Sequence, residues 1–326
     1  MWREQDQREL STDEIKKGFD ILKKLGIMEV VLSGGNPLLR EDAGEIIKYA
    51  SERFVTTVYD NGSMAGSRTD ILRDLDFVAI SIDSLNPDVN DRIKGVKGAW
   101  KKAIDTVETL YNEGINVAVT PTISQQNLYE IADITKHFLQ KGIPLWYCLY
   151  SYDITADVNQ LFKIGKANGA FVITDKQAMV KLCNTLLDMK KTNDKILMTD
   201  KLLKTLRDYY LLGQRTWGCR ALQNFFMIDH LGRIAGCHGH NIAGSIFDLP
   251  KLWRSQEFNQ LRSTYRKCTQ CTYLCYIFYS IHGSPYGNLS LAKEQWKNAG
   301  LLLKKSKPRH PELSKLQGET VKATIS

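Results

Sequence analysis

The first 150 residues alternate short runs of β-branched residues with amphipathic segments, and this alternation constrains the fold more than any other feature. The periodicities predict strands at 29–32, 54–58, 77–82, 115–120 and 145–149, and helices at 12–25, 42–52, 69–75, 100–113 and 128–140. Strands that are joined through helices run parallel, with right-handed crossovers. The pattern therefore predicts an α/β layer or barrel whose functional loops follow the carboxyl ends of the strands.

Glycine occurs at three similar junctions, Gly26, Gly114 and Gly142, where a predicted helix ends and a strand follows. Each is predicted to adopt the left-handed conformation that closes a helix C-terminus. Beyond residue 152 the alternation gives way to two predicted helices and then to a cysteine-rich stretch. We therefore divide the chain into a barrel part, a helical linker, a small cysteine-rich α+β domain and a basic tail, at 1–152, 153–215, 216–285 and 286–326.

Composition and charge limit the functional classes. With 43% hydrophobic and 25% charged residues, the chain has the balance of a globular protein. No apolar run reaches the roughly 18–20 residues that a membrane span requires, and the first residues do not resemble a signal peptide. The net charge is +8, and the residues from Tyr286 onward contribute eight basic and three acidic side chains to it. The remainder is nearly neutral, so we expect no nucleic-acid partner, no membrane partner and a cytoplasmic location.

Glycine and small polar residues follow several of the predicted strands. Gly34 and Gly35 allow the backbone to approach a ligand closely, and Asn36 adds an amide at the same edge. Because the carboxyl ends of parallel strands meet at one edge, the sequence predicts a shared pocket there. The alternative is local structure: a glycine turn before a proline-started helix, or caps of the next helix or turn at Ser81 and Asp83. The candidate residues are Ser33, Gly34, Gly35, Asn36, Asn61, Gly62, Ser81, Asp83 and Asn127.

Five of the seven cysteines, Cys219, Cys237, Cys268, Cys271 and Cys275, fall within 57 residues. Clustered thiols without a secretory signal indicate a metal site rather than a disulfide framework. The Cys-x-x-Cys spacing of Cys268 and Cys271 presents two thiolates to one metal, and a distant pair completes four-coordination.

Other features of this region have simpler interpretations. A β-hairpin that turns at Gly232 is predicted within residues 225–235. His238 and His240 flank Cys237 and are interpreted as solvated or hydrogen-bonded rather than as ligands. Two cysteines outside the cluster, Cys148 and Cys183, are predicted to be core residues.

The segments Gly34–Leu39, Asn61–Gly62, Ser81–Asp83 and Asn127, in this order and at these separations, resemble the radical S-adenosylmethionine (SAM) superfamily. The resemblance covers residues 11–152. It implies a TIM-barrel-like fold, here a partial (β/α)6 barrel that lacks its first strand, followed by the cysteine-rich domain.

The same resemblance implies roles for the candidate residues. The loop Ser33–Asn36 is expected to hold the methionine amino group of SAM. Asn61 and Gly62 are expected to shape the pocket floor. The residues expected near the ribose or the carboxylate of SAM are Ser81, Asp83 and Asn127.

Two departures from the family pattern matter. The family's loop has a glutamate where this chain has Asn36, and a charge-assisted hydrogen bond is worth about 1.5–3 kcal/mol against about 1 for a neutral one. We therefore expect SAM affinity to fall by a few-fold to tens-fold. The family's catalytic [4Fe–4S] cluster is bound by a Cys-x-x-x-Cys-x-x-Cys loop, whereas this chain has no cysteine before Cys148. We interpret the sequence as N-terminally truncated, with a descendant that lacks the cluster and is not catalytic as the alternative.

The cysteine-rich domain also resembles a family pattern. Between Cys219 and Cys237 lie twelve residues, Gly232 and four more residues, and the Cys268–Cys271 pair follows. This resembles the twitch or SPASM domain that follows some radical SAM barrels. It implies one auxiliary [4Fe–4S] cluster on these four cysteines, with Cys275 as a fifth sulfur whose role stays open. Zinc is the alternative, although zinc ribbons generally use two Cys-x-x-Cys knuckles.

Together the resemblances imply a radical SAM enzyme that abstracts a hydrogen atom from a small-molecule or peptide substrate. An electron donor such as ferredoxin or flavodoxin is the implied partner. The catalytic [4Fe–4S] cluster is expected only in the full-length protein, so the sequence as it stands is expected to be inactive, and its catalytic residues stay unknown. The alternative is a non-catalytic zinc- or cluster-binding protein on the same scaffold.

Overall fold

The computed structural model describes residues 8–153, 161, 165–166, 169–268, 273–283 and 294. Its centre is a four-stranded parallel sheet in the order β1 (Glu29–Leu32), β2 (Val55–Asp60), β3 (Phe77–Ile80) and β4 (Val117–Val119). A bridge from Val119 to Leu145 leads on to the parallel pair β5 (Thr122–Ile123) and β6 (Cys148–Leu149). The predicted α/β class with a parallel sheet is confirmed.

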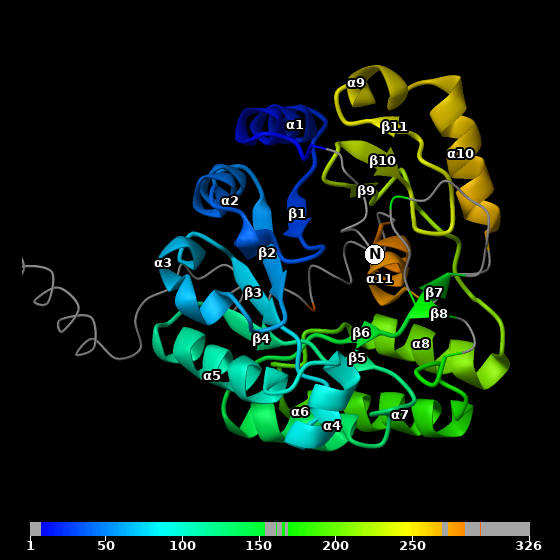
Figure 1. Ribbon diagram of the computed structural model, residues 1–326. Helices are drawn as coiled ribbons and strands as arrows, with labels where there is room; N and C mark the ends of the chain where they lie inside the picture. Colours follow the sequence, from blue (N-terminus) through cyan, green and yellow to red (C-terminus); the bar gives the residue numbers. More distant parts are fainter. Residues whose placement is uncertain are drawn as a thin grey trace, which may run out of the picture.

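Helices cover the outer side of this sheet (Figure 1). They are α1 (Thr12–Lys24), α2 (Ala43–Ser51), α3 (Thr69–Leu72), α4 (Pro87–Lys94), α5 (Ala99–Asn112) and α6 (Ile131–Gln140). A capping box starts α1, since Ser11 Oγ accepts from the Glu14 amide and the Glu14 carboxylate accepts from the Ser11 amide. The junction glycines Gly26, Gly114 and Gly142 have φ angles of 81°, 76° and 73°, as predicted.

Several elements differ from the prediction. Helix α4 was not predicted, because its sequence has little apolar periodicity; Asn86 caps it by accepting from the Asp88 and Val89 amides. The strands predicted at 115–120 and 145–149 shorten to β4 and β6, because their outer residues form turns and an isolated bridge instead of a continuous ladder.

Strand β1 is an edge of the sheet. In the described part of the chain it pairs with β2 alone, and its Val31 side chain is 42% exposed. Helix α11 (Leu274–His282) lies between β1 and β6 (Figure 1). Tyr279 of α11 interacts electrostatically with the Glu29 carboxylate of β1, and the rings of Phe278 and Trp146 meet edge to face at 5.3 Å.

The C-terminal half supplies further helices and a second small sheet. Helices α7 (Lys176–Thr192) and α8 (Asp200–Leu212) pack against each other and are the two helices predicted beyond residue 152. The predicted hairpin forms with Gly232 at its turn and gains a third antiparallel strand. The remaining elements are β7 (Tyr152–Asp153), β8 (Gly165–Lys166), β9 (Met227–Ile228), β10 (Arg233–Ala235), β11 (Gly244–Ser245), α9 (Leu249–Leu252), α10 (Gln256–Lys267) and the short 3-10 helices η1 (Pro37–Leu39) and η2 (Ala65–Ser67).

Two large hydrophobic cores organise these elements, beside a small third cluster that contains Phe77 and Ala118. The larger core lies between the sheet and its outer helices and includes residues of α7, α8 and α11. The second core joins α1 and α2 to the β9–β11 sheet and α10, for example through Phe19, Ile246 and Phe258. The cysteine-rich region therefore shares its core with the first helices of the chain.

Candidate functional site

The loop after β1 exposes its backbone. Gly34 has a φ of 125°, a conformation that favours glycine, and a Cβ at this position would meet no atom within 4 Å. In the described structure no hydrogen bond uses the amide or carbonyl groups of Gly34 and Gly35. The loop Ser33–Gly35 therefore presents open backbone donors and acceptors at a strand end.

Asn36 uses its side chain within the protein. Its Oδ1 accepts from the Leu38 amide at 3.0 Å and caps η1, while its Nδ2 lies 3.2 Å from Asp60 Oδ2 and 3.2 Å from Ser63 Oγ. A glutamate at this position would bring a second carboxylate against Asp60. The contact with Asp60 gives a local physical reason for an amide here.

Asp60 organises the loop after β2, and the sequence analysis did not single it out. Its buried carboxylate accepts from the backbone amides of Gly62, Ser63, Met64 and Ala65, the last three at 2.9, 3.3 and 3.1 Å. The Asp-Asn-Gly order was the available signal, because an aspartate commonly bonds the amides that follow it in a turn. The predicted pair Asn61–Gly62 therefore sits in a loop that one carboxylate holds.

The loop after β3 contains a buried ion pair. Lys94 Nζ lies 2.7 Å from Asp83 Oδ2 and also donates to Ser81 Oγ. Asp83 Oδ1 accepts from the Thr122 amide at 2.7 Å, which ties this loop to β5. The predicted residues Ser81 and Asp83 thus meet through Lys94, which comes from the unpredicted helix α4.

Asn127 is buried and joins the same network. Its Nδ2 donates to the carbonyl oxygens of Asp83 at 2.9 Å and Thr122 at 3.0 Å, and its Oδ1 accepts from the Ser124 amide at 2.8 Å. In this structure Asn127 positions the loops after β3 and β4. We call the loops after β1 to β4 the rim. The loops after β2 and β3 are also in contact, since the Ser81 amide donates to the Asp60 carbonyl oxygen.

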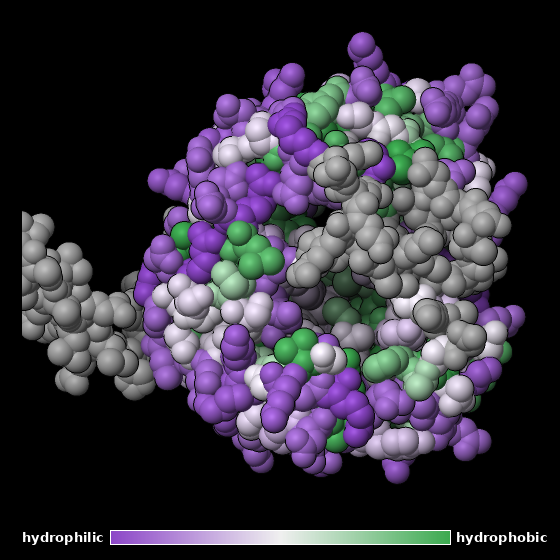
Figure 2. Space-filling view, in the orientation of Figure 1, coloured by the Kyte–Doolittle hydropathy of each residue, from purple (hydrophilic) through white to green (hydrophobic). Residues whose placement is uncertain are grey.

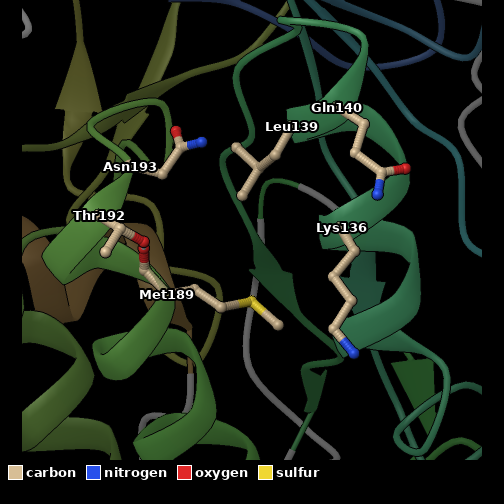
Figure 3. A pocket seen from close by; sticks show the side chains of 6 residues that line it. All are labelled: Lys136, Leu139, Gln140, Met189, Thr192 and Asn193. Atoms are coloured by element: carbon tan, nitrogen blue, oxygen red, sulfur yellow. The ribbon is translucent and has the colours of Figure 1, made fainter.

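The surface is hollowed on this side of the molecule, and hydrophobic side chains are visible on the floor of the hollow (Figure 2). A separate cavity of about 270 Å³ lies on the outside, where side chains of α6 face α7 and its C-terminal end (Figure 3). Its lining residues are Lys136, Leu139, Gln140, Met189, Thr192 and Asn193, and none of them is a candidate residue.

Three of the predicted cysteine ligands interact electrostatically with one buried side chain, Tyr265. The Tyr265 hydroxyl accepts from the Gly236 amide at 3.2 Å, and burial raises its pKa, helped by the thiols of Cys237, Cys219 and Cys268. Cys219 also lines a cavity of about 380 Å³ together with the cationic side chains Lys201, Arg220 and Arg266. The fourth predicted ligand, Cys271, lies outside the described residues. Among the residues that are described, no three His, Cys, Asp or Glu side chains are grouped closely enough to hold a metal ion.

Cys275 lies elsewhere in the site. It lies in the first turn of α11, and α11 packs against β6, the strand that carries Cys148. The prediction of a core residue is confirmed for Cys183, where burial raises the thiol pKa to about 12. Cys148 is half-buried on β6 and therefore fits that prediction only in part.

The two histidines near Cys237 pack against aromatic rings. His238 is buried beside Tyr273 and Tyr276, which excludes the solvated alternative and leaves the hydrogen-bonded one, and burial lowers its pKa to about 4. The His240 ring meets the Tyr265 ring edge to face at 4.6 Å.

Comparison with known proteins identifies the first part of the chain. A family model described as "Radical SAM superfamily" matches residues 2–138, which include all the strand-end loops of the rim. Residues 2–138 are a radical SAM domain. By this family resemblance the protein is an enzyme.

Similar proteins extend beyond the radical SAM domain. The AdoMet-dependent heme synthase of Oleidesulfovibrio alaskensis is 27% identical over 291 residues, which cover 81% of this chain and 73% of that protein. The PqqA peptide cyclase of Bradyrhizobium diazoefficiens is 24% identical over 278 residues, with 79% and 68% covered.

Among solved structures, SuiB of Streptococcus suis bound to S-adenosylmethionine superposes with a TM-score of 0.61 at 18% identity. The superposition covers 87% of this chain and 68% of SuiB and shows a shared fold.

In the described part of this chain, none of the helices combines the length and the apolar character needed to cross a bilayer.

Proposed function

We propose that the chain binds S-adenosylmethionine at the rim, with the loop Ser33–Asn36 receiving the methionine end. The observation that carries this proposal is the exposed backbone of Gly34 and Gly35, whose open amide and carbonyl groups can pair with the carboxylate and amino groups of an amino acid. Asp60, Asp83 and Asn127 hold the surrounding loops in place. When bound, SAM supplies the radical chemistry, while the chain's own residues bind it, orient it and exclude water.

A matched pair of glycine variants tests this site. Gly34 and Gly26 both have positive φ angles and open space where a Cβ would lie, but only Gly34 lies at the rim. We expect Gly34→Val to lower SAM affinity at least about tenfold by isothermal titration calorimetry, because the side chain blocks the open backbone. Gly26→Val carries a similar strain and is expected to leave the affinity unchanged. Equal affinities of the two variants would contradict the proposal.

We further propose that Cys219, Cys237, Cys268 and Cys271 bind one auxiliary [4Fe–4S] cluster. The support is that three of these thiols interact with the same buried tyrosine, Tyr265, and that Cys219 lines the larger cavity together with cationic side chains. A [4Fe–4S] cluster with four thiolate ligands carries a net negative charge, which such cationic side chains would stabilise.

Metal analysis tests the cluster. After anaerobic reconstitution, the full chain is expected to contain about one cluster of equal iron and sulfide content. Cys268→Ser should lose most of that iron, whereas Cys183→Ser, which removes a core thiol, should retain it. Iron and sulfide near zero in the parent chain would defeat the proposal. Zinc without sulfide would instead favour the non-catalytic zinc-binding alternative.

The class of reaction is inferred from the radical SAM domain of residues 2–138. We infer that the protein acts in radical hydrogen abstraction on a peptide or small molecule, since its relatives include a named peptide cyclase and a named heme synthase. A ferredoxin or flavodoxin would serve as the electron donor, in the cytoplasm. These 326 residues contain no cysteine before Cys148, so we expect them to bind SAM without cleaving it under dithionite. Formation of deoxyadenosine, measured by liquid chromatography, would contradict this expectation.

A further inference from the structure

The larger of the two cavities described above, of about 380 Å³, is lined by three cationic side chains, Lys201, Arg220 and Arg266. Among the described residues that line it there is no aspartate or glutamate. Asp200, the acidic neighbour of Lys201 in the sequence, has its carboxylate 3.7 Å from Lys190 Nζ instead. Like charges that line one cavity repel each other, and an anion between them would relieve that repulsion.

Separate parts of the chain build this cavity. Lys201 and Thr205 are four positions apart on α8 and therefore lie on one face of that helix. Arg266 comes from the last turn of α10, Arg220 precedes the β9–β11 sheet, and Ser280 lies on α11. The three cations are thus distant in the sequence, and the fold brings them to one cavity.

Helix α11 fixes two of these parts. Lys201 Nζ donates to the Ile281 carbonyl oxygen at 2.8 Å, and the Arg220 amide donates to Ser280 Oγ at 3.2 Å. Groups that are fixed before a ligand arrives lose little freedom when it binds. The part of the wall that carries Lys201 and Arg220 is therefore preorganised.

Most hydrogen-bond donors of these cations are unoccupied. In the described part of the chain, the guanidinium groups of Arg220 and Arg266 form no hydrogen bond and no ion pair. Lys201 uses one of the three donors of its ammonium group for Ile281. Electrostatic stabilisation of a nearby cluster would use the charges of these groups but not their donors. The donors are therefore available to a ligand in the cavity.

The unoccupied donors define the chemistry of that ligand. A planar guanidinium group matches a carboxylate or phosphate group with two parallel hydrogen bonds. The hydroxyl groups of Thr205 and Thr216 and the amide of Gln223 line the same cavity and can donate to further oxygens. The ring of Trp217 lines it as well, and the Arg215 guanidinium lies 4.7 Å from the centre of that ring, which adds a positive charge next to the wall.

We propose that this cavity binds a small molecule that carries two or more negative charges on phosphate or carboxylate groups. Arg220 and Arg266 bind its oxygens through their paired N–H groups, and Lys201 contributes a third charge. A volume of about 380 Å³ lies within the range of small-molecule sites. None of the lining residues belongs to the rim, so the inference goes beyond the binding of SAM.

Isothermal titration calorimetry of the full chain at low ionic strength tests the site with two probes, pyrophosphate and citrate. We expect at least one of them to bind with a Kd below about 1 mM, and the tighter probe decides between phosphate and carboxylate groups. Arg220→Gln and Arg266→Gln should each weaken this binding at least about tenfold. The control is Arg254→Gln, which removes an exposed arginine that does not line the cavity and should leave the Kd unchanged.

Thermal unfolding separates loss of the site from loss of the fold. Arg266 is exposed, so Arg266→Gln should melt at the temperature of the parent chain when no probe is present. The probe should raise the melting temperature of the parent chain and of Arg254→Gln, but raise that of Arg266→Gln less.

Two results would overturn the proposal. One is the absence of binding of both probes to the parent chain. The other is an equal loss of affinity in Arg254→Gln and Arg220→Gln, which would show that the probes respond to the overall positive charge. The titrations contain neither SAM nor iron, so a failure here is distinct from a failure of the proposed function.

Discussion

Asp83 and Lys94 form a nearly enclosed ion pair, with side chains 4% and 19% exposed. Removing one partner leaves the other charge buried without compensation, which costs about 3–5 kcal/mol of unfolding free energy. We expect this loss for Lys94→Met in urea unfolding. The control is Lys191→Met, which breaks a surface pair whose side chains are 75% and 70% exposed and should cost no more than about 0.5 kcal/mol. Equal losses for the two variants would show that the pair at the rim is not buried in solution.

Asp42 gives a prediction about pH. Its carboxylate accepts from Arg40 and Thr12, and the Arg40 hydrogen bond chiefly lowers the Asp42 pKa from 3.8 to about 2. The folded state therefore binds this proton less readily than the unfolded state does. The stabilisation is complete above the unfolded pKa and disappears as the pH falls from 3.8 to about 2, a loss of about 2 kcal/mol.

Urea unfolding between about pH 5 and pH 2 checks this, with Asp42→Asn as the comparison. The variant should show a shallower loss of stability across that window, since its amide does not titrate. Parallel curves for the two proteins would contradict the prediction.

Among the loops, Gly62 and Gly98 distinguish two reasons why a position requires glycine: a positive φ angle and a lack of space for a Cβ. Both have similar positive φ angles, 84° and 80°, but a Cβ on Gly62 would come 2.5 Å from Ala103 Cα, whereas one on Gly98 would meet nothing within 4 Å. We expect Gly98→Ala to cost about 1–2 kcal/mol from backbone strain alone. Gly62→Ala should cost about 1–3 kcal/mol more, because α5 must also move.

Thermal or urea unfolding of the two variants measures the difference. SAM titration adds a second readout, because the displaced loop after β2 borders the rim. If both substitutions lower the free energy of unfolding equally, the close approach of this loop to α5 does not exist in solution.

Helices and strands with strong periodicity follow directly from the sequence. The capping box of α1 and the glycine junctions place those elements almost to the residue. Helix α4 was missed because it is short and polar, and its start is marked only by Asn86 and the following proline. Because this helix was not predicted, the sequence analysis also missed Lys94, the cation that pairs with the buried Asp83.

At the scale of the whole molecule, the second core joins α1 and α2 to the cysteine-rich region. We expect these parts to unfold together, so that protected amides in α1 and α10 exchange through one global opening. Ile246→Ala should lower the opening free energy of both helices equally, by about 2–5 kcal/mol. Hydrogen exchange with mass spectrometry measures this.

The control for that experiment is Ile228→Ala, at a position that is 37% exposed, and it should change little. A loss of protection confined to α10 would show that the cysteine-rich region folds separately from the first helices.

The sequence by itself determined the α/β class, the order of the main strands and the strand-end residues, because strand and helix periods and glycine caps are local properties. It placed Asn36, Asp83 and Asn127 at the rim for the same reason. Only the tertiary structure decided what these side chains bond to, and that Asp60 and Lys94 hold the loops. Those contacts join residues distant in the chain, and their partners are selected by packing and by the need to pair every buried charge.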